Sequence, residues 1–365
     1  MEVTSSAPLY FKKLDTLRFV AFFLVFWQHG FLDYFVSLPN DEVAMVGPFI
    51  FTGGIGVHIF FVISGFLITF LMIKENNETG SVSLKNFYIR RMLRIWPVYY
   101  LVLLLGIFVL PHLSHRFQFS GDYVRSLLFL NNFSMENQSE NISIAWSVAI
   151  EEQFYLFWPI VFILVRNRTF LAFICLAVFA YSTFFIYVHT YPVSYLHSIS
   201  NLNYLMMGCV GAIFYAKNRK HPSLNNYLRP GYFFGAIVLA IALTVLEGMH
   251  IFNYMFLTCL LVLPALWLYL VIYLVHKEDG KPPSMFSSLG KYTYGMYFYH
   301  PILLIGMRAF FDLLHITYSK DIVNTVIIVV ISFALTLVIS KLSYTYFEKP
   351  ILTLKAKFSQ VKTRI

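Results

Sequence analysis

Arg18 and His29 lie eleven residues apart in an apolar stretch and could together hold and activate a charged ligand. At about 100° per residue, eleven residues return a helix almost to the same face, so both side chains share one side. They are then about 16 Å apart along the helix axis. Ionisable groups are costly inside a bilayer and usually mark a functional site there. The competing interpretation is that Arg18 only extends to the membrane surface and His29 bonds a neighbouring helix.

A second basic group, Arg90, Arg91 and Arg94, precedes another apolar stretch. Arg91 and Arg94 are three residues apart, so a helix projects them from one face. The guanidinium group suits bidentate phosphate contacts, which makes this pair a candidate phosphate clamp. Basic residues at the cytoplasmic end of a span also act as simple anchors, and spacing alone does not decide between the two interpretations.

Two adjacent carboxylates, Glu151 and Glu152, lie in a third apolar stretch. On a helix they diverge by about 100°, so only one of them can readily face a given cavity. A carboxylate beside His29 would orient the imidazole and raise its basicity, and we assign this role to Glu151. The alternative is an acid at the interface near water.

Two further segments have less definite roles. Residues 53–68 hold four glycines, which permit close approach between backbones or to a ligand. Two lone histidines, His58 and His300, lie in apolar stretches. Lone helix histidines more often pack than catalyse, so we interpret both as packed residues.

The bulk composition is typical of a membrane protein. Of 365 residues, 58% are hydrophobic and 12% are charged, and the mean hydropathy is +0.68. Apolar runs of about 20 residues cross a hydrocarbon core about 30 Å thick, and in lipid they must be helical. We therefore predict an all-α, polytopic integral membrane protein with about ten transmembrane helices. They lie near residues 14–36, 49–73, 95–112, 143–165, 169–188, 201–216, 231–247, 253–275, 289–311 and 322–346.

The distribution of lysine and arginine predicts the orientation. With the N-terminus in the cytoplasm, 23 of the 27 Lys and Arg residues fall in cytoplasmic segments. This follows the positive-inside rule, so we predict that both the N-terminus and the C-terminus are cytoplasmic. The same distribution explains the net charge of +9, and we expect no nucleic-acid partner.

The chain reads as one membrane domain over residues 1–365, because no hydrophilic stretch is long enough for a separate soluble domain. Its motif-bearing core covers about residues 14–350, followed by a basic cytoplasmic tail, 351–365. The first apolar stretch has no clear cleavage site, so we expect it to be retained. The connection 113–142 is either part of a substrate entrance or a solvated loop. The cysteines lack metal-like spacing, and we expect no metal.

The ordered motifs resemble the membrane acyltransferase family known as acyltransferase 3. Six motifs carry the resemblance over roughly residues 14–350. They are the pair Arg18 and His29, and the segments 56–68, 88–97, 146–155, 297–301 and 347–350. Position 58, often Asp in such proteins, is His58 here. Some members also carry an esterase-like domain at the C-terminus, and here we expect any second acceptor-side catalyst to be a separate protein.

The resemblance implies an integral-membrane O-acyltransferase of the bacterial inner membrane. Such an enzyme moves an acetyl group from cytoplasmic acetyl-CoA to a hydroxyl of an extracytoplasmic carbohydrate, such as a surface polysaccharide, an O-antigen or another envelope glycan. The implied catalytic residues are His29, as general base or acyl carrier, and Glu151, which orients it. The implied cofactor-binding residues are Arg18, Arg90, Arg91 and Arg94.

Two other classes of function compete with this interpretation. Intramembrane Arg, Glu and His also line the paths of transporters, so a transporter or flippase of a polar or acylated substrate is the alternative. We find no internal repeat, although many transporters have one. A membrane sensor or assembly factor with a decayed site is less compatible with the intact set of ionisable residues.

Overall fold

The computed structural model describes residues 10–39, 42, 53–117, 122–133, 143–248, 253–278 and 282–358. Regular structure in these ranges is helical and includes no strand, which confirms the predicted all-α class. The long helices are α1 (Lys12–Val36), α3 (Gly53–Thr79), α4 (Leu84–Leu104), α7 (Ala145–Leu164), α8 (Arg168–Val188), α10 (Ser198–Asn218), α12 (Pro230–Gly248), α13 (Asn253–His276), α15 (Thr293–Leu313) and α16 (Ile322–Ser343).

Short helices connect or extend the long ones. They are α5 (Tyr123–Leu127), α9 (Val193–Leu196), α11 (Leu224–Tyr227), α14 (Met285–Gly290) and α17 (Lys349–Leu354). A π-helical turn, Tyr344–Glu348, joins α16 to α17, and a final 3-10 turn covers Lys355–Phe358. Parts of the predicted entrance loop, 118–121 and 134–142, lie outside the described residues.

Seven helices of the described chain are long and apolar enough to cross a membrane. They begin at Lys12, Gly53, Leu84, Ala145, Arg168, Val193 and Ile322. The structure therefore supports a multi-pass membrane protein. The apolar stretches Pro230–Leu246 and Leu260–His276 are shorter, and α15 carries charged side chains. The predicted count of ten and the predicted orientation of the termini stay predictions.

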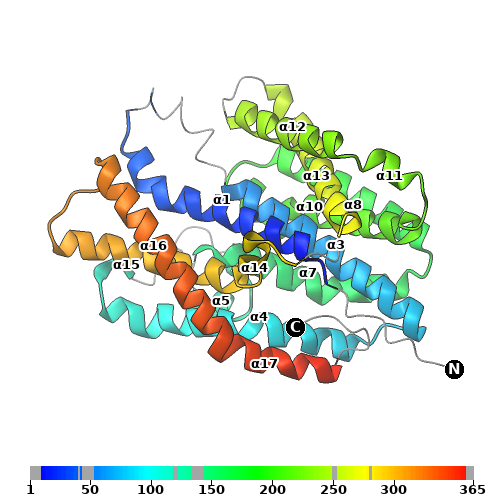
Figure 1. Ribbon diagram of the computed structural model, residues 1–365, viewed down its shortest axis with the longest axis horizontal. Coiled ribbons are helices and arrows are strands. Elements are labelled where there is room, and N and C mark those ends of the chain that lie inside the picture. Colours follow the sequence, from blue (N-terminus) through cyan, green and yellow to red (C-terminus); the bar gives the residue numbers. More distant parts are fainter. Residues whose placement is uncertain are drawn as a thin grey trace.

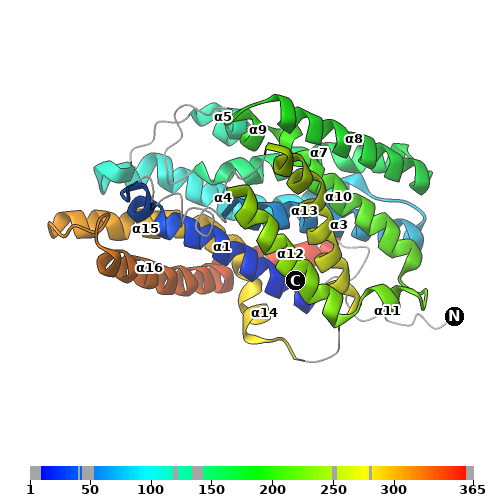
Figure 2. The ribbon, with the colours of Figure 1, turned by 90° about the horizontal axis from the view of Figure 1, so that it is seen from above.

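Helix α1 lies at the centre of the arrangement. It packs against α3 on one side and against α14, α15 and α16 on others. Figure 1 shows α1 between α16 and α3, and in the view from above α8 and α16 lie on opposite sides of it (Figure 2). Side chains on several faces of α1 are therefore buried, including Leu14, Phe22 and Phe26. This position lets α1 present polar residues to a site inside the protein.

Helices α3 and α10 cross with their backbones in close contact. A Cβ atom added to Gly65 would collide with the Leu205 carbonyl oxygen, and one added to Gly208 would collide with the Val62 carbonyl oxygen. Glycine has no Cβ, so it permits this crossing. The glycine segment predicted from sequence thus serves helix packing at Gly65.

Helix α4 begins eleven residues before the predicted start of its span. Ser83 accepts a hydrogen bond from the Asn86 amide and caps the helix at Leu84. Apolar periodicity locates the lipid-crossing part of a helix but does not show its polar extension. Because of this extension, Arg90, Arg91 and Arg94 all lie within the helix and have fixed directions.

The segment predicted as a basic tail is helical as far as Phe358. Helix α17 and the turn Lys355–Phe358 pack against α4, and Figure 1 shows α17 beside that helix. Residues 359–365 lie outside the described residues. The beginning of this segment is therefore part of the folded domain.

Candidate active site

A cavity of about 510 Å³ lies between α1, α3, α4, α7, α15 and the C-terminal segment. Its lining includes Arg18 from α1, Ser64 from α3, Arg94 from α4, Glu151 from α7 and Tyr297 from α15. These residues come from distant parts of the chain. The fold thus brings residues from all six separate sequence motifs to one internal space.

Positive charge predominates in this cavity. Its cationic lining residues are Arg18, Arg91, Arg94, Lys291, Lys349 and Lys355. Its acidic lining residues are Asp15, Glu151 and Glu348. Gathering like charges away from bulk water is costly unless a ligand of opposite charge binds among them. The lining is therefore suited to an anionic ligand with several charges.

Arg18 is held in place by a neighbour on its own helix. Its Nη1 atom lies 2.5 Å from Oδ1 of Asp15, which is 3% exposed. Tyr10 donates a hydrogen bond of 2.5 Å to the other oxygen of this carboxylate. Asp15 thereby fixes the direction of the Arg18 guanidinium group while leaving it in the cavity lining.

Arg91 and Arg94 both line the cavity, as their three-residue spacing predicts. The Arg91 guanidinium carbon lies 5.7 Å from the ring centre of Phe87 and 5.6 Å from that of Tyr155. Its Nε atom is buried and has no hydrogen-bond partner in the described structure. A buried guanidinium nitrogen without a partner normally indicates a missing acceptor. Arg91 therefore has capacity to bind an anion.

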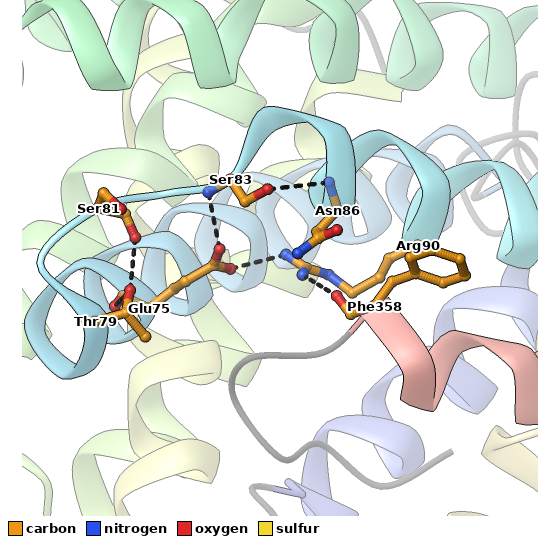
Figure 3. Close-up of polar contacts among 7 residues, drawn as sticks. All are labelled: Glu75, Thr79, Ser81, Ser83, Asn86, Arg90 and Phe358. Atoms are coloured by element: carbon orange, nitrogen blue, oxygen red, sulfur yellow. Dashed lines mark hydrogen bonds and ion pairs between the residues drawn. The ribbon is translucent and has the colours of Figure 1, made fainter.

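Arg90, the third predicted arginine, points elsewhere and is not among the cavity-lining residues described. It forms an ion pair of 2.8 Å with Glu75 of α3 and donates a 2.7 Å hydrogen bond to the Phe358 carbonyl oxygen. Glu75 also accepts from the Ser83 amide at 3.0 Å. Figure 3 shows this cluster. Arg90 thus connects α3, α4 and the C-terminal segment, a structural role that spacing alone did not reveal.

Of the two adjacent carboxylates, Glu151 is the one that lines the cavity. It accepts a 2.6 Å hydrogen bond from Ser64 and a 3.2 Å hydrogen bond from Tyr155. Glu152 points in another direction and accepts a 2.8 Å hydrogen bond from the Trp96 indole. The predicted divergence of the two side chains is therefore present in the structure.

His29 lies outside the described lining of the cavity and contacts a different residue from the one expected. Its Nδ1 atom is 2.9 Å from Nε2 of His300, and the two rings are nearly parallel, 8° apart. The described partners of Glu151 are Ser64 and Tyr155, so His300, and not Glu151, holds the His29 ring. The sequence could not show this contact because it joins residues 271 positions apart.

His300 is buried, as expected for a packed histidine, but it is also hydrogen-bonded at both ring nitrogens. His58 fits the packing interpretation more simply. Its ring stacks on Tyr204 at 3.9 Å between ring centres and 9° between planes.

The described lining of the cavity includes Tyr297 and Ser147, whose hydroxyl oxygens are 2.7 Å apart. The ring centre of Tyr297 lies 5.9 Å from that of His300. Tyr297, which lines the cavity, therefore packs against His300, the partner of His29.

Several lining residues were not identified from the sequence. Asp15 had a usable signal, because a carboxylate three residues before Arg18 lies on the same helix face. Lys349 lies in the motif at 347–350 but was not singled out there, and Lys291 and Lys355 had no signal, since cytoplasmic lysines are expected wherever a span ends. Only the return of the C-terminal segment to α4 brings Lys349 and Lys355 into the cavity.

Comparison with known proteins agrees with the arrangement of motifs. The family described as "Acyltransferase domain", acyltransferase 3, matches residues 11–344. A Staphylococcus aureus (strain COL) protein named "Putative O-acetyltransferase" is 28% identical over 330 residues, covering 82% of this chain and 53% of that protein. A Bacillus subtilis protein named "Putative peptidoglycan O-acetyltransferase YrhL" is 25% identical over 339 residues, 82% of this chain and 51% of its own length.

A shorter match is the Listeria monocytogenes protein named "Peptidoglycan O-acetyltransferase OatA". It is 36% identical over 124 residues, 29% of this chain and 19% of that protein. This chain spans about half the length of the full-domain relatives it matches. No solved structure matches it significantly. Since the family match covers nearly the whole chain, this protein belongs to the acyltransferase 3 family of membrane acyltransferases.

Proposed function

We propose that this protein is a membrane O-acyltransferase that transfers an acetyl group from acetyl-CoA to a hydroxyl of an envelope glycan. The observation that carries the proposal is the cationic cavity, in which the buried Nε atom of Arg91 has no acceptor among the described residues. Acetyl-CoA has several phosphate charges at one end and a reactive thioester at the other. The cavity has positive charge for the phosphates, and Tyr297 of its lining packs against His300, the partner of His29.

The phosphates meet Arg91 and Arg94, whose guanidinium groups suit bidentate binding. Arg18 lies further along the cavity, held by Asp15. Lys349 and Lys355 add charge from the C-terminal segment. Arg90 has no part in this binding, because Glu75 and Phe358 occupy its guanidinium group.

The pantetheine arm then runs toward Tyr297, with the thioester at the inner part of the cavity. His29 lies outside the described lining of the cavity and contacts His300, so the side chains between the cavity and His29 must move before the thioester carbonyl reaches His29. His29 takes the proton of the acceptor hydroxyl, or carries the acetyl group itself. In both routes an ester forms on the acceptor oxygen, the thioester C–S bond breaks, and the CoA sulfur leaves as a thiol after gaining a proton.

The names of the relatives suggest the acceptor, and the distribution of charge suggests the orientation of the site in the membrane. Two relatives are named for peptidoglycan O-acetylation, so peptidoglycan and other surface glycans are the acceptors we propose. The basic end of the helices faces the cytoplasm of a bacterial cell, where acetyl-CoA is available, and His29 lies toward the outer face. CoA then stays inside the cell while the acetyl group leaves it.

Binding of acetyl-CoA to the purified protein in lipid nanodiscs tests the clamp. Arg91→Gln and Arg94→Gln should each weaken binding by at least about tenfold, because a hydrogen bond to a charged group contributes about 1.5–3 kcal/mol. Arg166→Gln is the matched control, since Arg166 is exposed and does not line the cavity. Equal affinity in all four proteins would exclude the assignment, and passage of a substrate across the membrane without acyl transfer would indicate a transporter.

A further inference from the structure

Helix α15 holds His29 at two points. His300 contacts the His29 ring through an N···N distance of 2.9 Å. Arg308, two turns further on, donates a 2.7 Å hydrogen bond to the His29 carbonyl oxygen. Arg308 in turn forms an ion pair of 3.1 Å with Asp33, one turn after His29 on α1. Both the ring and the backbone of His29 are therefore fixed by the same neighbouring helix.

The hydrogen-bond partners of His300 determine which of its ring nitrogens carries a proton. Its Nδ1 atom lies 3.1 Å from the Met296 carbonyl oxygen, which can only accept. Nδ1 of His300 must therefore be the donor. In a neutral imidazole the other nitrogen is then an acceptor, so Nε2 of His300 receives a hydrogen bond.

The surroundings of His300 favour this neutral form. The side chain is 0% exposed and its ring is enclosed by those of Phe22, Phe26 and Tyr297, at 5.7, 6.0 and 5.9 Å between ring centres. No carboxylate in the described structure forms an ion pair with it. A buried charge without a partner is costly, so the proton is better placed elsewhere.

These steps fix the tautomer of His29. Since Nε2 of His300 accepts, Nδ1 of His29 carries the proton and donates it. The second nitrogen of His29, Nε2, then keeps its lone pair and is the basic and nucleophilic atom of the ring. We propose that His300 is a positioning residue that holds His29 as the Nδ1–H tautomer and directs its Nε2 atom to the reacting groups.

The proposal rests on the acyl-transfer function proposed above and assigns an atom to its reactive step. When His29 Nε2 takes the acceptor proton, the ring becomes an imidazolium whose Nδ1–H still points at the His300 lone pair. That contact stabilises the charged ring. The chain of hydrogen bonds ends at the Met296 carbonyl, which cannot take up a proton, so His300 orients His29 and does not carry the proton away.

Two substitutions separate this role from simple packing. His300→Gln keeps an amide oxygen that can accept from His29 Nδ1, whereas His300→Leu fills the space without an acceptor. We expect His300→Leu to lower kcat by about 10–100-fold, the size of loss seen when the partner that orients a metal-binding histidine is removed. The KM for acetyl-CoA should stay unchanged, because His300 is outside the described cavity lining. His300→Gln should recover most of the lost kcat. His189→Leu is the control, because His189 is exposed, hydrogen-bonds the Phe185 carbonyl and stacks on the Phe185 ring.

A direct measurement of the tautomer accompanies the kinetics. In protein labelled with ¹⁵N-histidine, solid-state NMR distinguishes protonated from unprotonated ring nitrogens, and the difference from His29→Asn protein assigns the signals of His29. We expect unprotonated Nε2 and protonated Nδ1 on His29, with a mixture of tautomers in His300→Leu. The opposite tautomer in the unaltered protein would overturn the proposal, as would unchanged kcat in His300→Leu.

The NMR measurement does not depend on catalytic turnover. Its result can therefore contradict the positioning role of His300 without contradicting the proposed acetyl transfer, and the kinetics can do the reverse. If the unaltered protein shows the expected tautomer but transfers no acetyl group, the positioning role of His300 is supported and the proposed function is contradicted. Full acetyl transfer with the opposite tautomer would support the proposed function and overturn the role of His300. If His300→Leu does not fold, the tautomer of the unaltered protein and the kinetics of His300→Gln still decide.

Discussion

Some charged residues in and near the cavity have a partner that sets their direction. Asp15 holds Arg18 at 2.5 Å, and Glu75 holds Arg90 at 2.8 Å. Arg91 differs, because its buried Nε atom has no hydrogen-bond partner in the part of the chain that the structure describes, and its guanidinium group faces two aromatic rings. Arg90 and Arg91 of α4 have the same side chain and differ only in their partners. Those partners make Arg90 a structural residue and leave Arg91 as a candidate for binding a ligand.

The Asp15–Arg18 pair gives a prediction at the scale of single residues. Asp15→Asn leaves the Arg18 charge uncompensated in a partly buried site, and we expect the free energy of unfolding to fall by about 3 kcal/mol. Chemical denaturation in detergent micelles measures this change. In the double variant with Arg18→Gln, much of the loss should be recovered, because no unpaired charge is left. Strictly additive effects of the two substitutions would show that the pair has no stabilising interaction.

At the scale of helices, the sequence predicted where most elements lie but not how they meet. The apolar runs at 14–36, 169–188 and 322–346 correspond closely to α1, α8 and α16. Long apolar stretches have a strong physical signal, since lipid requires a continuous helix. The start of α4 and the helical C-terminal segment were missed, because both are polar and depend on capping and on contacts with other helices.

The same reasoning applies to the candidate site. The shared face of Arg91 and Arg94 and the divergence of Glu151 from Glu152 follow from helix geometry, and the structure agrees with both. The contact of His29 with His300 joins α1 to α15, and no local pattern reports such a pairing. Helix periodicity thus predicts directions on one helix, whereas contacts between helices require the fold.

The cluster in Figure 3 gives a prediction at the scale of elements. Arg90→Gln removes the ion pair with Glu75 and weakens the link to Phe358, so the C-terminal segment should separate more readily from α4. Hydrogen–deuterium exchange over residues 349–358 should become faster. Acetyl-CoA affinity should fall less than in Arg91→Gln, because the effect on Lys349 and Lys355 is indirect.

Lys85→Gln is the matched control for this experiment, since Lys85 is an exposed residue near the start of the same helix. It should leave exchange in the C-terminal segment unchanged. If Arg90→Gln weakened acetyl-CoA binding as much as Arg91→Gln while exchange stayed slow, Arg90 would be a direct ligand contact and the structural role would be wrong.

At the scale of the whole molecule, the proposed function needs one orientation of the protein in the membrane. The basic ends of the helices, where the cavity gathers its lysines and arginines, must face the source of acetyl-CoA. In a variant without native cysteines, Lys220→Cys should resist a membrane-impermeant thiol reagent added to intact cells. Lys320→Cys should react, because it lies in the connection at the other end of the helices. The reverse pattern of labelling would contradict the proposed orientation.

Acetyl transfer by the purified protein is the decisive test of the proposed function. Protein in sealed proteoliposomes is given acetyl-CoA labelled in the acetyl group on the basic side and a glycan acceptor on the other, and mass spectrometry measures ester formed on the glycan. We predict labelled ester with the unaltered protein and a loss of at least about 100-fold with His29→Ala, the size typical of a missing general base. His189→Leu should retain activity. Full ester formation by His29→Ala would contradict the account.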